Sequence, residues 1–215
     1  LAHLETLQMK QSELTPQERG EYLDVATRQS RRIGLLVEQL LEAAKLEAGQ
    51  VTVNVEPFPI GELLQDVVQK FALAARDCGV ALEVDAMAAA TMVSGDIALL
   101  ERVLDNLIDN ALRHTPIGGR VTVQSQPRGE RVRVSVTDSG PGLTREEAER
   151  AFKRFYRGDP GRSTHSGQSG LGLAIVKSIL ELHGSDVAVE SQPGHGASFY
   201  FELPIVTQPP RTAPT

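Results

Sequence analysis

Asp138-Ser139-Gly140-Pro141-Gly142 follows directly on the alternating residues Val132, Val134 and Val136, which predict a strand with one buried face. An aspartate at the end of such a strand is a candidate acceptor at a buried edge, and the two glycines let the backbone come close to a flat ligand. A tight turn from a strand to a helix would use the same residues. This stretch alone therefore predicts either a ligand pocket or a turn.

A second motif, Asn106-Leu107-Ile108-Asp109-Asn110, lies in a predicted helix that Asp96 can cap. The spacing of four residues places the two asparagine amides on one helix face. Amide oxygens are hard, neutral ligands that suit Mg²⁺, which would keep waters and take its other ligands from phosphates. Asparagine pairs are common on helices, so this signal is weak by itself.

A third motif, Gly167-Gln168-Ser169-Gly170-Leu171-Gly172-Leu173, opens a predicted helix. Backbone N–H groups at a helix N-terminus bind anionic oxygens, and the helix dipole favours negative charge there. No Gly-Lys-Ser/Thr follows, which excludes a Walker loop. No leading strand or third glycine gives the spacing of a dinucleotide fingerprint.

Hydrophobic patterns around these motifs predict helices at 60–79, 96–114 and 170–183, and a capping box at 144–147. Predicted strands, which look antiparallel, lie at 80–84, 120–126, 131–137, 187–191 and 197–203. Helices and strands around one core indicate an α+β fold, a two-layer α/β sandwich.

A long helix precedes this region and begins at Thr15-Pro16-Gln17-Glu18, a capping box with proline at the first helical position. It is expected to run to about Leu46, with Gly49 ending it. Its seam has the seven-residue repeat of a bundle: Tyr22, Ala26, Gln29, Ile33, Leu36, Leu40 and Ala43.

Residues 1–13 read as the tail of a preceding helix, so 1–48 would be a helical hairpin. Pairing with a second copy would cover its apolar faces in a dimeric four-helix bundle. A helical subdomain packed on the rest of the chain is the alternative. Residues 49–58 are then a linker, 59–205 a second domain, and 206–215 a disordered tail.

Composition narrows the function classes. The 215 residues carry a formal net charge of −6, which argues against a dedicated nucleic-acid binder. The single cysteine, Cys78, excludes an internal disulfide and a cysteine-based zinc site. No apolar run approaches the roughly 18 residues of a membrane span, and we expect no signal peptide within these residues.

The order of the motifs is more specific than any one of them. The asparagine pair, the Asp138 stretch, Phe152-Lys153-Arg154-Phe155, Gly170-Leu171-Gly172-Leu173 and Gly194-His195-Gly196 together resemble the ATP-binding domain of sensor histidine kinases. That domain belongs to one superfamily with DNA gyrase, mismatch-repair and heat-shock chaperone ATPases. The resemblance covers about residues 56–205, and the hairpin at 1–48 resembles the kinases' dimerisation and histidine-phosphotransfer domain.

This resemblance implies ATP and Mg²⁺ as cofactors and assigns roles to residues. Asn110 would coordinate Mg²⁺ with help from Asn106, and Arg113 would approach a phosphate. Asp138 would accept from the adenine amino group, in a pocket shaped by Gly140 and Gly142. Residues 153–169 would form a lid over the phosphates. The remaining phosphate contacts implied are Arg154 and Arg157, more weakly Arg162, the side chain of Ser169, and the backbone of Gly170, Leu171 and Gly172. Phe152 and Phe155 would pack the base of the lid.

The resemblance also implies a reaction. Hydrolytic members of the superfamily have a glutamate where this chain has Asn106, and an amide cannot act as a general base. Transfer of the γ-phosphoryl group to a histidine is therefore favoured over hydrolysis, with a response-regulator aspartate as the next acceptor. His3 does not fit the family's phosphorylation box, so we expect the acceptor histidine upstream of this chain.

The implied partners are a second copy through residues 1–48 and a response-regulator receiver domain, without nucleic acid. The chain would be the cytoplasmic portion of a protein held in the bacterial inner membrane by upstream regions. Two alternatives are a free-standing serine kinase of the same superfamily and a non-catalytic nucleotide-binding dimerisation module.

Overall fold

The computed structural model describes residues 15–156 and 170–206. Contacts divide the chain into two compact units, residues 1–42 and 43–215. The predicted domain boundary at residue 48 stays a prediction. The structure adds that Ala43 and Leu46 are buried in the core of the second unit.

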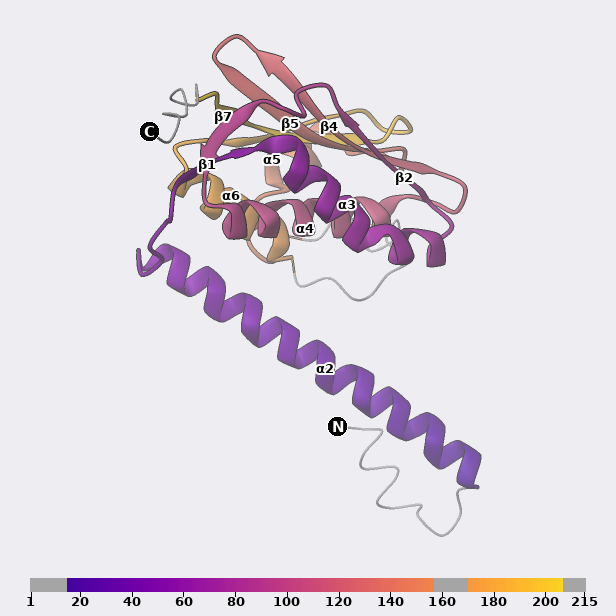
Figure 1. Cartoon of the computed structure of the whole chain (residues 1–215). Helices are drawn as coiled ribbons and strands as arrows, with labels where there is room; N and C mark the ends of the chain where they lie inside the picture. The colour runs from indigo at the N-terminus through magenta and orange to yellow at the C-terminus, as the bar shows by residue number, and fades with distance from the viewer. Residues whose placement is uncertain (1–14, 157–169, 207–215) are drawn as a thin grey trace, which may run out of the picture. The chain divides into compact units, whose positions relative to one another are not determined.

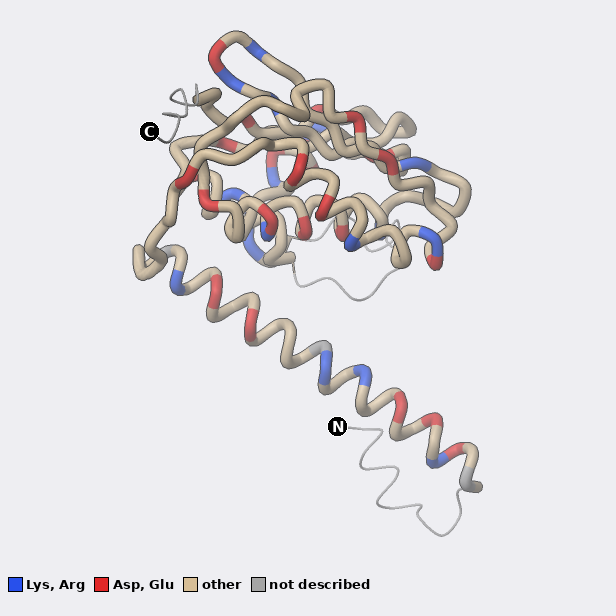
Figure 2. Tube along the Cα trace, viewed as in Figure 1, with Lys and Arg blue, Asp and Glu red and all other residues tan. Residues whose placement is uncertain are grey.

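Helix α2 (Pro16–Glu47) begins where the capping box predicts. The N–H of Thr15 donates to the Glu18 carboxylate at 2.8 Å, and the N–H of Glu18 donates to the Thr15 hydroxyl at 3.3 Å. Acidic and basic residues are interspersed along α2 (Figure 2). Ile33 and Leu40 of the expected seam are exposed in this single chain. The dimeric bundle stays a prediction.

The second unit contains a five-stranded sheet of order β2-β4-β5-β7-β6 with helices α3 (Ile60–Asp77), α4 (Ile97–His114) and α6 (Gly172–Leu182) along one face (Figure 1). The strands are β2 (Ala81–Ala86), β4 (Arg120–Arg128), β5 (Arg131–Asp138), β6 (Val187–Ser191) and β7 (Ala197–Pro204). The α+β fold is confirmed. One expectation is wrong, because β2 pairs parallel with β4 and the sheet is mixed.

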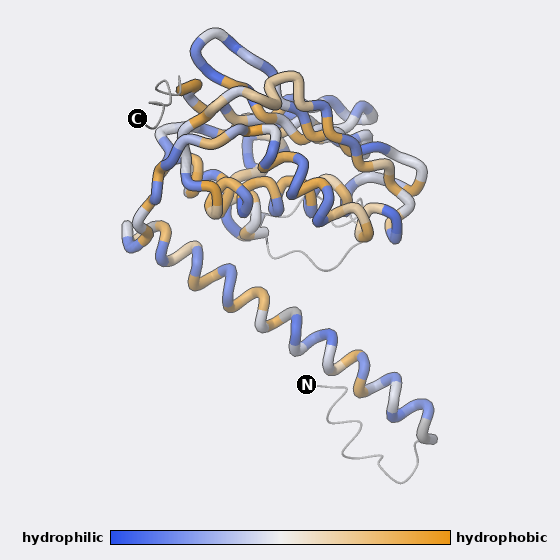
Figure 3. The backbone as a smooth tube through the Cα atoms, viewed as in Figure 1, coloured by the Kyte–Doolittle hydropathy of each residue, from blue (hydrophilic) through white to orange (hydrophobic). Residues whose placement is uncertain are grey.

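Alternating strand residues and the apolar helix faces form one core. Val132, Val134 and Val136 of β5 are buried, as the pattern predicts, and Phe199 and Phe201 of β7 lie beside them. Figure 3 shows the mixture of hydrophobic and hydrophilic positions along each element. This packing fixes the direction of β5, and so the position of its last residue, Asp138.

Two short elements differ from the expectations. The predicted linker ends in a strand, because β1 (Glu56–Pro59) pairs antiparallel with β3 (Met92–Gly95). Val206, in the expected disordered tail, donates its N–H to the carbonyl of Met92 at 3.0 Å. The short helix α5 (Arg145–Arg150) has the predicted capping box of Thr144 and Glu147.

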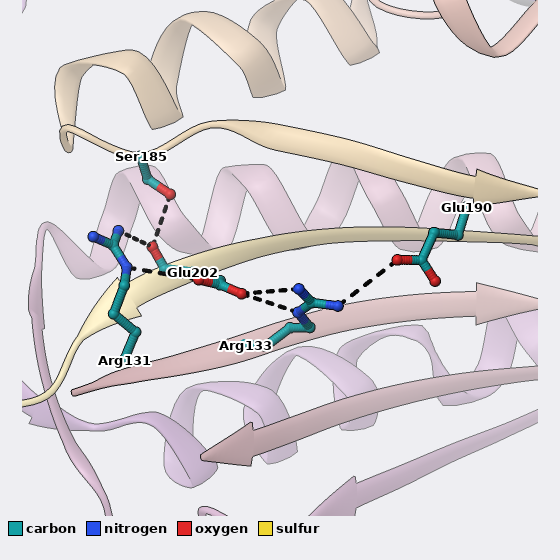
Figure 4. Close-up of polar contacts among 5 residues, drawn as sticks. All are labelled: Arg131, Arg133, Ser185, Glu190 and Glu202. Carbon is teal, nitrogen blue, oxygen red and sulfur yellow. Dashed lines mark hydrogen bonds and ion pairs between the residues drawn. The ribbon is translucent and has the colours of Figure 1, made fainter. Parts of the chain in front are cut away.

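The other face of the sheet carries an ion-pair network (Figure 4). Arg133 donates from Nε and Nη2 to one carboxylate oxygen of Glu202, both at 3.0 Å, and lies 3.8 Å from Glu190. The Glu202 carbonyl accepts from Arg131 at 2.7 Å and from Ser185 at 2.8 Å. These contacts link β5 to β6 and β7 and pair Arg131 and Arg133 with Glu190 and Glu202.

Candidate functional site

The first side of the site is the solvent-facing side of α4. Asp96 caps this helix by accepting the N–H of Leu99 at 3.1 Å. Leu104, Leu107 and Ile108 point into the core and are fully buried. Asn106 and Asn110 are partly exposed, so the core packing turns their amides away from the sheet.

Asn106 meets the N-terminus of α6. Its Nδ2 donates to the carbonyl of Arg102 at 2.8 Å, which leaves Oδ1 facing Gly172. A Cβ placed on Gly172 would lie 2.8 Å from that oxygen, so any side chain there would overlap the amide. The structure thus brings the asparagine and Gly-Leu-Gly motifs together across 66 residues of sequence.

Asn110 lies one turn beyond Asn106 on the same face and is partly buried. Arg113 follows, but its Nε donates to Asp109 at 2.8 Å. The Arg113 guanidinium is therefore held along the helix, beside the asparagine face. A phosphate contact from Arg113 stays a prediction that requires this exposed pair to open.

The second side is the end of β5. Asp138 is buried, and its Oδ1 accepts the N–H of Gly140 at 2.8 Å. Burial raises the pKa of the Asp138 carboxyl, against the N–H groups of Gly140 and Ala197 and the charge of His114, which act to lower it. The motif is thus an ordered, enclosed acceptor as well as a turn.

Glycine is required around this carboxyl. A Cβ on Gly140 would lie 2.5 Å from the carbonyl oxygen of His114. Gly142 has φ +67°, and a Cβ there would overlap the carbonyl of Gln192. Gly196 has φ +78° and lies against the carbonyl of Asp138, a role that sequence reasoning missed although the Gly194–Gly196 turn was part of the motif series.

The third side is the chain that leads into and out of residues 157–169. The N–H of Phe155 donates to the carbonyl of Gly170 at 2.9 Å, so the two ends of this segment meet. Phe155 has φ +57° and Gly170 has φ +69°. Phe152 packs edge-on against Phe199 of β7, with ring centroids 6.1 Å apart. Phe155 is 62% exposed, and its packing against the lid stays a prediction because residues 157–169 lie outside the described residues.

The remaining predicted contacts divide into two groups. Arg154 is exposed in the turn before Phe155. The side chain of Leu171 is buried, so only its backbone can face a ligand. The lid residues Arg157, Arg162 and Ser169, as well as His3, lie outside the described residues.

The amide oxygens of Asn106 and Asn110 are the donors that a magnesium ion would use at this site. In residues 15–156 and 170–206, no group of three or more His, Cys, Asp or Glu side chains is arranged to hold a metal ion. Neutral amide oxygens such as Oδ1 of Asn106 suit a cation that takes most of its ligands from phosphates and water.

Comparison with known proteins agrees with this geometry. Residues 95–207 match the family described as histidine kinase-, DNA gyrase B-, and HSP90-like ATPase, and the chain belongs to this family. The sensor-like histidine kinase SenX3 of Mycobacterium tuberculosis is 34% identical over 180 residues, 84% of this chain and 44% of SenX3. The sensor protein DivL of Caulobacter vibrioides is 36% identical over 173 residues, 80% of this chain and 22% of DivL.

A solved structure extends the likeness to the fold. Full-length ShkA in complex with AMPPNP aligns with a TM-score of 0.75 and 29% identity, over 93% of this chain and 41% of that chain. The chain therefore spans less than half the length of each of these relatives. None of the helices in the part of the chain that the structure describes is long and apolar enough to cross a membrane.

Proposed function

We propose that this chain binds Mg-ATP and supplies the γ-phosphoryl group for phosphorylation of a histidine, as the ATP-binding part of a sensor histidine kinase. The observation that carries the proposal is the contact of Asn106 with Gly172, which joins an amide ligand set to a backbone anion site. The buried Asp138 lies at the end of the adjoining strand. ShkA, which has this fold, was solved with an ATP analogue.

Each side of the site has a separate task. The Asp138 carboxylate accepts from the adenine amino group, beside the close-packed turn that Gly140 and Gly142 make possible. The backbone N–H groups at the start of α6 bind phosphate oxygens, because the first N–H groups of a helix point toward its N-terminus and the helix dipole favours anions there. Asn106 and Asn110 hold Mg²⁺, which neutralises phosphate charge when bound. Arg154, Arg157 and Ser169 are proposed to contact the phosphates.

Transfer to a protein nucleophile follows from what α4 lacks. The amide of Asn106 cannot take a proton from water, so the site positions ATP without activating a water through this residue. Helix α2 contains no histidine. His183 has both ring nitrogens in hydrogen bonds. We propose, from the likeness to sensor histidine kinases, that the acceptor histidine lies on a helix that packs with α2, and that a response-regulator aspartate receives the phosphoryl group from it.

The proposed assembly uses the exposed apolar side of α2. A second copy would cover Ile33 and Leu40 in a homodimeric bundle, and the whole protein would act on the cytoplasmic side of the membrane. A chain that forms no dimers in solution would contradict this part of the proposal without affecting the nucleotide site.

Calorimetric titration with Mg-ATP tests the site. Asn110→Ala should weaken Mg-ATP binding far more than it lowers the free energy of unfolding, because the amide lies on the partly exposed face of α4. Gln65→Ala removes an exposed amide from α3 and is the matched control. Unchanged Mg-ATP affinity in Asn110→Ala would show that the metal assignment is wrong.

The chemistry of the product separates the alternatives. With γ-labelled ATP and a longer partner chain that carries the family's phosphorylation box, the label should be acid-labile, as expected for phosphohistidine. Acid-stable label on serine would favour the free-standing serine kinase. Nucleotide binding without any transfer would favour a non-catalytic dimerisation module.

A further inference from the structure

Asp96 connects three parts of the second unit. Its Oδ1 accepts the N–H of Leu99 at the start of α4. Its Oδ2 accepts the N–H of Asn54, in the segment that follows α2, at 2.8 Å. Its own N–H donates to Nε2 of His183, the C-cap of α6, at 3.0 Å. Asp96 is buried, so these bonds are shielded from water.

The histidine has a single hydrogen-bonding arrangement here. Because Nε2 accepts from Asp96, it carries no proton, and Nδ1 is the nitrogen that donates to the carbonyl of Ile179 at 2.8 Å. Gly95 makes room for the ring, since a Cβ there would lie 3.3 Å from His183 and 2.6 Å from Leu100. His183 thus fastens the end of α6 to the start of α4.

Helix α6 is consequently held against α4 at both of its ends, by Gly172 and by His183. Asn106 lies 10 residues after Asp96, about 15 Å along α4 at 1.5 Å per residue. Gly172 lies 11 residues before His183, about 16 Å along α6. The helices run antiparallel and the two lengths match, so the Asn106–Gly172 contact lies at the other end of α6 from the Asp96–His183 bond. A shift of α6 along α4 would disturb both.

The segment between α2 and β1 reaches this junction through a backbone group. Asn54 donates its N–H to Asp96, and only a short stretch of chain separates Asn54 from the end of α2 at Glu47. A displacement of that segment therefore acts on the residue that sets the start of α4. No sequence pattern indicates this contact, because the partners of Asp96 lie 42 and 87 residues away.

We propose that Asp96 and His183 are positioning residues that set α6 against α4 and so hold the phosphate half of the nucleotide site, with the segment at Asn54 acting on it through Asp96. The proposal rests on the proposed function. It concerns the Asn106–Gly172 contact and leaves the adenine pocket at Asp138 unaffected.

Two substitutions of His183 separate positioning from stability. His183→Gln places an amide oxygen where Nε2 accepts from Asp96 and loses the bond to Ile179. His183→Asn keeps a donor near Nδ1 and loses the bond to Asp96. Each variant loses one hydrogen bond, so a merely structural role predicts equal effects. We expect Mg-ATP affinity to fall roughly three- to tenfold in His183→Asn, the range for one hydrogen bond, and to stay near wild type in His183→Gln.

Adenosine is the internal control, because it uses only the adenine pocket. Its affinity should be the same in both variants and in the wild type. Equal losses of Mg-ATP affinity in the two variants, or a parallel loss for adenosine, would overturn the positioning role. A wild-type chain that binds no Mg-ATP would instead refute the proposed function itself.

Asn54→Pro tests the connection to the preceding segment. Both substitutions remove the asparagine side chain, but proline also removes the N–H that Asp96 accepts and fixes φ, whereas alanine keeps the N–H. Titration of both variants should show weaker Mg-ATP binding, by about threefold or more, in Asn54→Pro alone. Equal affinities in two folded variants would overturn this connection. Should Asn54→Pro not fold, hydrogen exchange of the Asn54 amide decides: it should slow when Mg-ATP binds, and an unchanged rate overturns the connection.

Discussion

Gly172→Ala tests the contact on which the nucleotide site depends. The added Cβ would lie 2.8 Å from Oδ1 of Asn106, closer than a Cβ normally approaches a heavy atom. The amide is the end of a flexible side chain, so it can rotate away without a shift of the backbone. The substitution should therefore displace the proposed ligand and leave the fold in place.

The expected effects on folding nearly cancel. Rotation of Asn106 breaks its bond to the carbonyl of Arg102, which costs about 1 kcal/mol. Alanine in place of glycine in a helix returns at most about 1 kcal/mol. Binding of Mg-ATP has no such compensation, because the loss of one contact with a charged group costs about 1.5–3 kcal/mol. The affinity for Mg-ATP should fall about ten- to a hundredfold.

Chemical denaturation and calorimetric titration measure the two effects on one sample. Gly20→Ala in α2 is the matched control, since no atom lies within 4 Å of a Cβ there. It should stabilise the helix and leave Mg-ATP affinity unchanged. Wild-type affinity in Gly172→Ala would refute the view that the start of α6 and Asn106 form one phosphate site.

Three further substitutions test other parts of the structure. Burial raises the pKa of Asp138, so the folded chain keeps the carboxyl proton to a higher pH than the unfolded chain does. The stability of the wild type should therefore fall relative to that of Asp138→Asn as the pH rises through the raised pKa. Denaturation of both proteins across this pH range measures the difference, and a difference that does not change with pH would contradict the prediction. The hydroxyl of Ser125 is buried without a hydrogen-bond partner among the described residues, so Ser125→Ala should raise the free energy of unfolding by about 1 kcal/mol, and a loss would be evidence for a missed partner. Glu202→Gln weakens the ion pair between Glu202 and Arg133, whose side chains are 31% and 30% exposed, respectively. It should lower the free energy of unfolding by about 1 kcal/mol, and by less at high salt. A loss of stability that salt does not change would rule out an electrostatic origin.

Helices and strands with a clear hydrophobic period were predictable from the sequence. Short strands, and pairings that depend on contacts between distant segments, were not. The alternation at Val132–Val136 and the caps at Thr15, Asp96 and Thr144 gave the right elements. Strand β1 was missed because Pro57 and Pro59 cannot donate to a ladder, which a strand paired on one side tolerates. The parallel pairing of β2 with β4 depends on the crossover through α4, which no local pattern shows.

The site shows the same division. The motifs named the residues around Asp138 and Gly172, because their chemistry and spacing are local. The pairing of Arg113 with Asp109 and the exposure of Phe155 depend on side-chain packing that spacing does not determine. The bond between Asp96 and His183 joins two helix ends far apart in sequence, so only the fold shows it.

The most direct test of a nucleotide site between α4, β5 and α6 is the response of individual glycine amides to Mg-ATP, followed by NMR on the isotope-labelled chain. The resonances of Gly140, Gly142 and Gly172 should shift with a common saturation curve, while Gly129, in the β4–β5 turn at the opposite end of β5, should not move. Shifts at Gly129 with Gly140 and Gly172 unchanged, or no shifts at saturating Mg-ATP, would contradict the account.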